Sequence, residues 1–295
     1  MKKIPFDQIR NELTEEACVS LSVMRLDRIH PEVSGNKLFK LHYFVEECLA
    51  TTRRTMLTFG GAYSNHLVAT AFLCREKGLR SIGIVRGEEP SQLSHTLLRC
   101  LELGMHLEFI SRENYRSITN EHDYDELTER FGDCTIVPEG GFSVEGARGA
   151  ALITDLIEGT PSHICTAVGT ATTLAGLLMK KNSTQEIIGV PVIKKITDIN
   201  ARILQLTGNE ADLPVLFAEY HFGGYAKYTD QLIDFMNSFY AETRIPLDFV
   251  YTAKMMFGVI DQIKKGYFKK GSRVLCLHTG GLQGNLSLPA GTLIY

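Results

Sequence analysis

Short apolar runs alternate with amphipathic segments along most of the chain. The runs TMLTF (55–59), SIGIV (81–85), HICTAV (163–168) and RVLCLH (273–278) have the length of buried strands. The segment SNHLVATAFLCREKG (64–78) has the period of a helix and ends at glycine, a common helix C-cap. Strands separated by helices of about 10–15 residues are typical of β-α-β crossovers and parallel sheets. The pattern therefore predicts an α/β fold.

Two arrangements are compatible with this alternation. A single (β/α)₈ barrel is one, because the number of strand–helix units is close to eight. The long polar segment 111–126 and the irregular spacing favour two unequal open parallel sheets with flanking helices. We find no sequence repeat and no linker-like segment. The chain is therefore expected to enter and leave its domains by crossovers.

Composition narrows the class of protein. The 295 residues are 44% hydrophobic and 22% charged with a net charge of -3, which gives no indication of nucleic-acid or membrane-surface binding. The N-terminal MKKIPFDQIRNEL has no apolar run after its lysines, so no signal peptide is expected. The seven cysteines form no C-x-x-C motif, and the nine histidines have no metal-ligand spacing. We expect a reduced, cytoplasmic protein without a metal site.

Three strands are followed by turns that are rich in small and polar residues. In open parallel sheets, ligands bind beyond the carboxyl ends of the strands. FGGAYSNH (59–66) places three polar residues after two glycines at a helix start, although capping alone explains one of them. In AVGTATTLAG (167–176), backbone N–H groups and threonine hydroxyls favour a compact monophosphate, since no nucleotide-binding glycine motif is present. Such turns also occur without ligands, and LHTGGLQGN (277–285) alone indicates only a tight turn.

Lys37 has an unusual position at the end of the small-residue turn in SGNKLFKL (34–41). A cation is unfavourable at a helix N-terminus, but the same field with some burial lowers the pKa of an amine and makes it a better nucleophile. A solvated surface lysine is the alternative, and Lys227 and Lys254 are rival candidates. A reactive lysine, a monophosphate cradle and no redox motif together suggest pyridoxal 5′-phosphate held as a Schiff base.

Five motifs, taken in their order along the chain, resemble those of a known family. SGNKLFKL, GGAYSNH, VGTATTLAG, LDFVYTAK and HTGG are similar to fold-type-II pyridoxal-phosphate enzymes of the D-cysteine desulfhydrase and 1-aminocyclopropane-1-carboxylate deaminase family. The resemblance runs from about residue 20 to the C-terminus. It implies a tryptophan synthase β-like fold, with a large domain (1–51 plus 161–295) and a small inserted domain (52–160). It also implies a homodimer.

The resemblance implies roles for individual residues. Lys37 would form the Schiff base and move the substrate's α-proton, with Ser64 as a second active-site hydroxyl. Tyr251 would face the substrate as an acid/base or stacking group, and Asn65 would bond the 3′-oxygen of the cofactor ring. Thr279 would contact the pyridine nitrogen. The phosphate would lie on the turn formed by Gly169, Thr170, Ala171, Thr172 and Thr173.

These roles imply a reaction. A hydroxyl beside the pyridine nitrogen makes a weaker electron sink than a carboxylate, which suits α,β-elimination of a small amino acid to a keto acid and ammonia. Ring opening of the cyclopropane amino acid, a β-replacement synthase, and cofactor binding without turnover remain open. Ala171 and Thr172 stand where relatives often have two glycines, so we expect a different conformation of the phosphate turn.

Overall fold

The computed structural model describes residues 4–30, 33, 35–121, 124–194, 198–209 and 213–295. The chain divides into unit 1 (1–36 and 150–295) and unit 2 (37–149). These divisions fall earlier than the domain boundaries suggested by the sequence, 51/52 and 160/161. The first division falls earlier because helices α2 (Lys37–Lys40) and α3 (His42–Ala50) pack on elements of unit 2.

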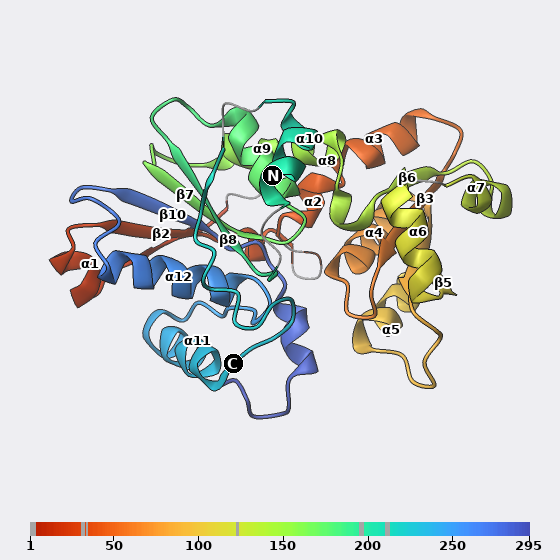
Figure 1. Cartoon of the computed structure of the whole chain (residues 1–295). Coiled ribbons are helices and arrows are strands. Elements are labelled where there is room, and N and C mark those ends of the chain that lie inside the picture. Colours follow the sequence, from red (N-terminus) through yellow and green to blue (C-terminus); the bar gives the residue numbers. More distant parts are fainter. Residues whose placement is uncertain (1–3, 31–32, 34, 122–123, 195–197, 210–212) are drawn as a thin grey trace. The chain divides into compact units, whose positions relative to one another are not determined.

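Unit 1 is built on a six-stranded sheet of order β1-β2-β10-β7-β8-β9. Only β1 runs antiparallel to its neighbour, and the other pairs are parallel. Figure 1 shows the N-terminal strand β2 beside the C-terminal strand β10. The strands are β1 (Phe6–Ile9), β2 (Ser20–Met24), β7 (His163–Val168), β8 (Glu186–Pro191), β9 (Val215–Leu216) and β10 (Arg273–Leu277).

Helices cover both faces of this sheet, α9 and α10 on one and α11 and α12 on the other (Figure 1). The central strands are therefore apolar on both sides, as in other buried parallel sheets. The α-helices are α1 (Glu12–Glu16), α9 (Thr172–Lys180), α10 (Ile199–Thr207), α11 (Asp230–Thr243) and α12 (Thr252–Lys264). Short 3₁₀ segments are η1 (Leu26–Arg28), η3 (Leu152–Leu156) and η4 (Leu282–Ser287).

Unit 2 contains an all-parallel sheet of order β5-β4-β3-β6. Its strands are β3 (Thr55–Gly60), β4 (Arg80–Arg86), β5 (His106–Ile110) and β6 (Thr135–Val137). Its further helical elements are α4 (Asn65–Lys77), α5 (His95–Glu102), α6 (Arg112–Glu121), α7 (Asp125–Phe131), η2 (Glu139–Gly141) and α8 (Val144–Ala151, which ends in unit 1). The polar segment 111–126 contains α6, which is anchored by the buried ring of Tyr115 against Phe59.

The predicted α/β class with two open parallel sheets is confirmed, and the barrel alternative is wrong. Within the described ranges, no helix combines the length and the apolar character needed to cross a membrane. Because β7 and β10 are neighbouring parallel strands, their carboxyl ends leave the sheet side by side. The turns that follow them are two of the three singled out by the sequence.

Gly149, inside α8, provides a test of packing in unit 2. A Cβ added there would lie 2.2 Å from the carbonyl oxygen of Phe39. We expect Gly149→Ala to lower the free energy of unfolding by about 3 kcal/mol, because backbone overlap outweighs the roughly 1 kcal/mol gain in helix propensity. Thermal unfolding of both proteins measures this. Gly61→Ala is the control, since its added Cβ meets only an Arg86 guanidinium nitrogen at 3.4 Å. Equal melting temperatures for the Gly149 variant and the wild type would contradict this packing.

Candidate active site

In unit 1, the turn after β7 presents backbone donors and hydroxyls. It runs through Gly169, Thr170 and Ala171 into α9, whose N-cap is Ala171 and has no side-chain capping bond. The hydroxyls of Thr170 and Thr172 lie 2.9 Å apart, and Thr172 and Thr173 are buried. A helix start whose N–H groups are not capped by a side chain, with hydroxyls beside it, suits an anion.

The conformation of this turn corrects one expectation. Ala171 adopts φ +69°, in the left-handed region that glycine favours. Alanine therefore does not avoid positive φ at this position, and it adopts the left-handed geometry at a cost of roughly 1–2 kcal/mol. The predicted difference from relatives in how the turn holds a phosphate stays a prediction. Thr172 begins the regular helix, so only one of the two positions carries this strain.

The turn after β10 is joined to the small-residue turn before Lys37. The amide of Asn36 donates to the carbonyl oxygen of Thr279 at 3.4 Å, and its side-chain Nδ2 donates to Thr173 Oγ1 at 2.7 Å. Gly35 has φ +84°, and a Cβ there would lie 1.9 Å from the Thr279 carbonyl oxygen. Gly35 and Asn36 thus bring the Thr173 and Thr279 turns together. Ser34 of this motif lies outside the described residues.

Lys37 is fixed to this junction by the chain itself. It follows Asn36 directly, and one peptide bond separates the residue that contacts both turns from the lysine. Lys37 begins α2 and is partly buried. Lys37 is therefore the residue that directly follows this junction along the chain.

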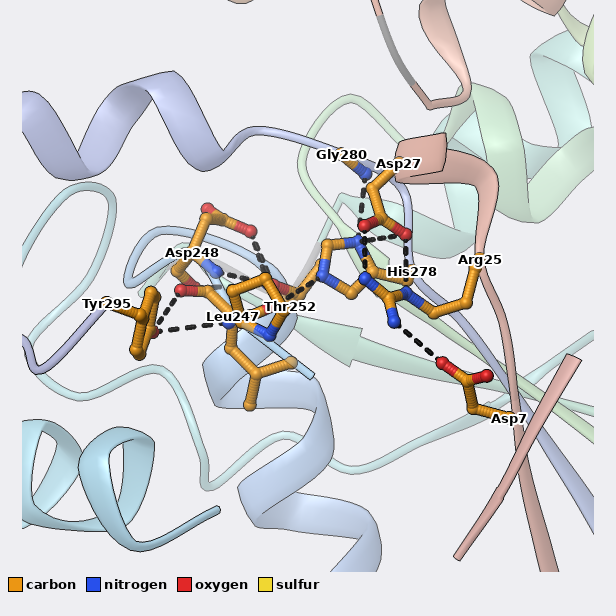
Figure 2. A network of polar contacts seen from close by, with 10 residues as sticks. Asp7, Arg25, Asp27, Leu247, Asp248, Thr252, His278, Gly280 and Tyr295 are labelled. Atoms are coloured by element: carbon orange, nitrogen blue, oxygen red, sulfur yellow. Dashed lines mark hydrogen bonds and ion pairs between the residues drawn. The ribbon is translucent and has the colours of Figure 1, made fainter. Parts of the chain in front are cut away.

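Tyr251 lies at the start of α12, and a buried carboxylate holds it there. Asp248 Oδ2 accepts from the Tyr251 amide at 2.9 Å, and Oδ1 accepts from the amide and hydroxyl of Thr252 at 2.8 and 2.7 Å. Figure 2 shows Asp248 and Thr252 in this arrangement. The Tyr251 ring would lie 3.3 Å from a Cβ added at Gly169, so this glycine lets the ring approach the phosphate turn. The Tyr225 hydroxyl lies 3.4 Å from that of Tyr251.

A network of polar side chains holds His278, the residue before Thr279 (Figure 2). Arg25 donates to both oxygens of Asp27, at 2.8 and 2.6 Å, and to Asp7 at 2.7 Å. Asp27 in turn lies 3.3 Å from His278 Nδ1, while His278 Nε2 donates to the Pro246 carbonyl at 2.7 Å. Buried ions are tolerated only when paired in this way. The network fixes His278, and hence the residue that follows it.

Unit 2 contains two lysines on α2, Lys37 and Lys40. Lys40 is buried, and its Nζ donates to the Gly140 carbonyl at 3.1 Å. Burial, with a smaller contribution from the Lys37 charge, holds the pKa of Lys40 well below its ordinary value. No carboxylate among the described residues forms an ion pair with Lys40. A buried amine without a counter-ion suits an anionic ligand.

The predicted Ser-Asn-His turn of unit 2 begins α4. Ser64 is the N-cap and accepts from the Leu67 amide at 3.4 Å, so the capping interpretation holds for this residue. A Cβ on Gly60 would lie 2.6 Å from Ser64 Oγ, so glycine is required there. Asn65 Oδ1 and both ring nitrogens of His66 are buried without a hydrogen-bond partner in the described part of the chain. Burial, then the charges of Lys40 and Lys37, lower the pKa of His66 to about 3.

Several residues of this site were not assigned from the sequence. Asn36 and Lys40 stand inside SGNKLFKL, and a three-residue spacing of lysines on one helix was a signal for the second. Asp248 and Tyr225 had no such signal, because their partners are distant in sequence. The structure brings together Asn36, Thr173 and Thr279 in unit 1, and separately Lys37, Lys40 and His66 in unit 2.

Comparison with known proteins adds independent findings. A family model described as pyridoxal-phosphate dependent enzyme matches residues 11–280. A Thermotoga maritima protein provisionally named a 1-aminocyclopropane-1-carboxylate deaminase is 31% identical, over 94% of this chain and 93% of its own. A Klebsiella pneumoniae D-cysteine desulfhydrase is 28% identical, over 88% of this chain and 86% of its own.

Solved structures show the same architecture. The crystal structure of an ACC deaminase homologue superposes with a TM-score of 0.81 at 25% identity, covering 97% of this chain and 91% of that one. A threonine deaminase from Solanum lycopersicum has a TM-score of 0.68 at 14% identity, covering 98% and 85%. The second likeness concerns the fold alone. Together they give this chain the fold of the type-II pyridoxal-phosphate enzymes.

The contact between Gly35 and Thr279 leads to one prediction. Gly35→Ala should lower the free energy of unfolding by about 3 kcal/mol, because the side chain would overlap the carbonyl oxygen at a backbone conformation that disfavours alanine. Thermal unfolding of the apo protein measures this. Gly284→Ala is the control, because its added Cβ has no neighbour closer than 4.0 Å. An unchanged melting temperature for the Gly35 variant would refute the close approach.

The lowered pKa of His66 predicts a pH dependence. As pH falls below the ordinary value of 6.5, the unfolded chain binds the proton before the folded chain, whose His66 pKa is about 3. Stability is therefore lost over that interval, by up to about 4 kcal/mol. The melting temperature of wild type should fall more steeply than that of His66→Gln as pH is lowered from 6.5 to 4. His106→Gln, at an exposed histidine, is the control. A pH-independent difference for the His66 variant would contradict the burial of this imidazole.

Proposed function

Because the chain belongs to the family of pyridoxal-phosphate dependent enzymes, we propose that it is a lyase similar to D-cysteine desulfhydrase. It would remove the α-proton and the β-substituent of a small amino acid, and water would release ammonia and a keto acid. D-Cysteine and one water would give pyruvate, ammonia and hydrogen sulfide. The observation that carries the proposal is the junction of the two turns by Gly35 and Asn36, one residue before Lys37.

The residues present fit the cofactor. In unit 1, Asn36 Oδ1 is buried without a partner among the described residues, and the uncapped start of α9 lies beside two buried threonines. In unit 2, Asn65 Oδ1 is equally unpartnered, and Lys40 adds a buried amine. Buried polar atoms that lack partners in the protein alone are expected where a ligand supplies them.

We assign the following roles to the cofactor-holding residues. Pyridoxal 5′-phosphate, when bound, withdraws electrons from the α-carbon of the amino acid. The amine of Lys37 would hold its aldehyde carbon, and Asn65 would bond the ring 3′-oxygen. Thr279 would offer its hydroxyl to the pyridine nitrogen. The phosphate would accept hydrogen bonds from the turn of Gly169, Thr170, Ala171, Thr172 and Thr173.

Three residues would handle the substrate. Lys37 Nζ would take the α-proton, which requires a neutral amine. One observation supports that state, namely the place of Lys37 at a helix start. Ser64 would orient the substrate through its hydroxyl, and Tyr251 would protonate the departing group or stack on the substrate.

The partner of the pyridine nitrogen favours elimination. Thr279 supplies a hydroxyl, which cannot hold a proton on that nitrogen as a carboxylate does. Reactions that depend on a long-lived negative charge at the α-carbon are then disfavoured. A β-substituent that departs quickly suits the site better. The substrate is therefore proposed to carry a good leaving group, such as a thiol.

Three alternative activities can be distinguished from this elimination by the products that each would release. The name of the Thermotoga maritima relative suggests a first alternative, ring opening of the cyclopropane amino acid. A β-replacement synthase would need added sulfide and an activated serine to form a new amino acid. A cofactor-binding protein without turnover would release neither ammonia nor keto acid. We also propose a homodimer, by analogy with the family, which light scattering after gel filtration would test.

The proposal is tested by spectroscopy with a substrate panel. We expect the purified protein with cofactor to show the visible absorption band of cofactor bound to a lysine amine. D-Cysteine, L-cysteine, D-serine and 1-aminocyclopropane-1-carboxylate are added separately. D-Cysteine should shift the band and release pyruvate and ammonia. Release from the cyclopropane amino acid alone would instead establish the ring-opening activity.

A lysine variant decides the cofactor assignment. Lys37→Ala should lose the band and at least about 1000-fold of the activity, because the amine serves both binding and proton transfer. Lys227→Ala is the matched control at an exposed lysine. A band retained in the Lys37 variant would overturn the assignment. A band that responds to no amine would favour cofactor binding without turnover.

A further inference from the structure

Lys254 is a fully buried lysine whose role is not explained by the proposed chemistry. It lies in the first turn of α12, three residues after Tyr251, and has no exposed surface. No carboxylate among the described residues forms an ion pair with it. Burial lowers its pKa to about 8, with the charge of Asp248 acting in the opposite direction. A cation at such a position is costly, so its contacts should serve a purpose.

Those contacts are two backbone carbonyls of one loop. Lys254 Nζ donates to the carbonyl oxygens of His221, at 3.0 Å, and Gly224, at 2.7 Å. The loop has an unusual backbone, since φ is positive at Phe222, Gly223, Gly224 and Ala226. Non-glycine residues rarely adopt this conformation, and they persist in it where surrounding contacts hold them. The buried ammonium is the polar contact that ties this loop to α12, and Phe222 also packs edge-to-face on Phe257 of that helix, with ring centroids 4.9 Å apart.

The loop presents a tyrosine to the proposed substrate-facing residue. Tyr225 follows Gly224 directly, and its ring packs edge-to-face on that of Tyr251, with centroids 6.0 Å apart. The two hydroxyls are 3.4 Å apart. Tyr251 belongs to the same helix start as Lys254, while Tyr225 belongs to the loop that Lys254 binds. The Lys254 side chain therefore links the loop that carries Tyr225 to the helix start that carries Tyr251.

We propose that Lys254 is a positioning residue that holds Tyr225 beside Tyr251 by binding the carbonyls of the 221–224 loop. It would determine how tightly the substrate is bound, without taking part in bond making. The inference rests on the proposed function for the placing of Tyr251 at the substrate. The tie between loop and helix is independent of that function.

The geometry excludes the rival role of Lys254 as the cofactor-holding amine. Its Nζ is enclosed and engaged by two carbonyls, so it is not offered to a ligand. The same carbonyls keep a partner without it, because His221 O accepts from the Gly224 amide and Gly224 O from the Lys227 amide. A methionine of similar length would fill the space and leave no carbonyl without a partner. Lys254→Met is therefore expected to fold.

Hydrogen exchange of the cofactor-loaded protein tests the tie. In Lys254→Met, the amides of Gly224 and Lys227 should exchange at least tenfold faster than in wild type. Lys254→Gln keeps an N–H donor and should give an intermediate rate. Lys227→Met is the control, because it removes an exposed lysine of the same loop and should leave exchange unchanged. Unchanged exchange in both Lys254 variants would overturn the proposal.

Kinetics on the substrate found by the panel test the consequence. Lys254→Met should keep the cofactor's absorption band and raise KM about tenfold with kcat within twofold, while Lys254→Gln partly restores KM. A fall in kcat at constant KM would overturn the positioning role. If wild type turns over no amino acid, the proposed function fails. The exchange measurement still decides whether Lys254 holds the loop.

Discussion

The close approach of Gly35 to the carbonyl oxygen of Thr279 is the constraint on which the candidate site of unit 1 depends. Any side chain at position 35 would overlap that oxygen, so only glycine lets the chain pass there. Asn36 can then reach both the Thr279 carbonyl and the Thr173 hydroxyl. Two turns that are about a hundred residues apart in sequence are joined by one dipeptide. The residue after this dipeptide is the lysine proposed to hold the cofactor.

Buried polar groups, each with a defined partner, fix the supports of these turns. Asp27 holds His278 at the end of β10, and Asp248 holds the start of α12 (Figure 2). Removing charges from water is costly, and the cost is offset only when every atom finds a partner in one geometry. Such networks are therefore stiff. Stiff supports are what a site needs in order to orient a cofactor and a departing group.

Burial also sets the chemical character of the amines and the imidazole. Lys40 and Lys254 are both enclosed, and burial lowers the pKa of each. Their surroundings nevertheless differ. Lys254 donates hydrogen bonds to two carbonyls of a loop. Lys40 donates to one carbonyl and lies near Lys37 and a neutral His66. The first suits a structural tie, and the second suits a site that receives an anion.

The sequence alone determined the α/β class, the alternation of elements, the three polar turns and the lysine after a small-residue turn, because strand length, helical period and turn chemistry are local properties. It did not determine that segment 37–51 packs with unit 2, that Ala171 keeps a left-handed conformation, or which lysine is tied to a loop. Asp248, Tyr225 and Lys254 acquire their roles from partners that folding brings close. Those roles depend on burial and on hydrogen bonds between distant segments, and only the tertiary structure decides these.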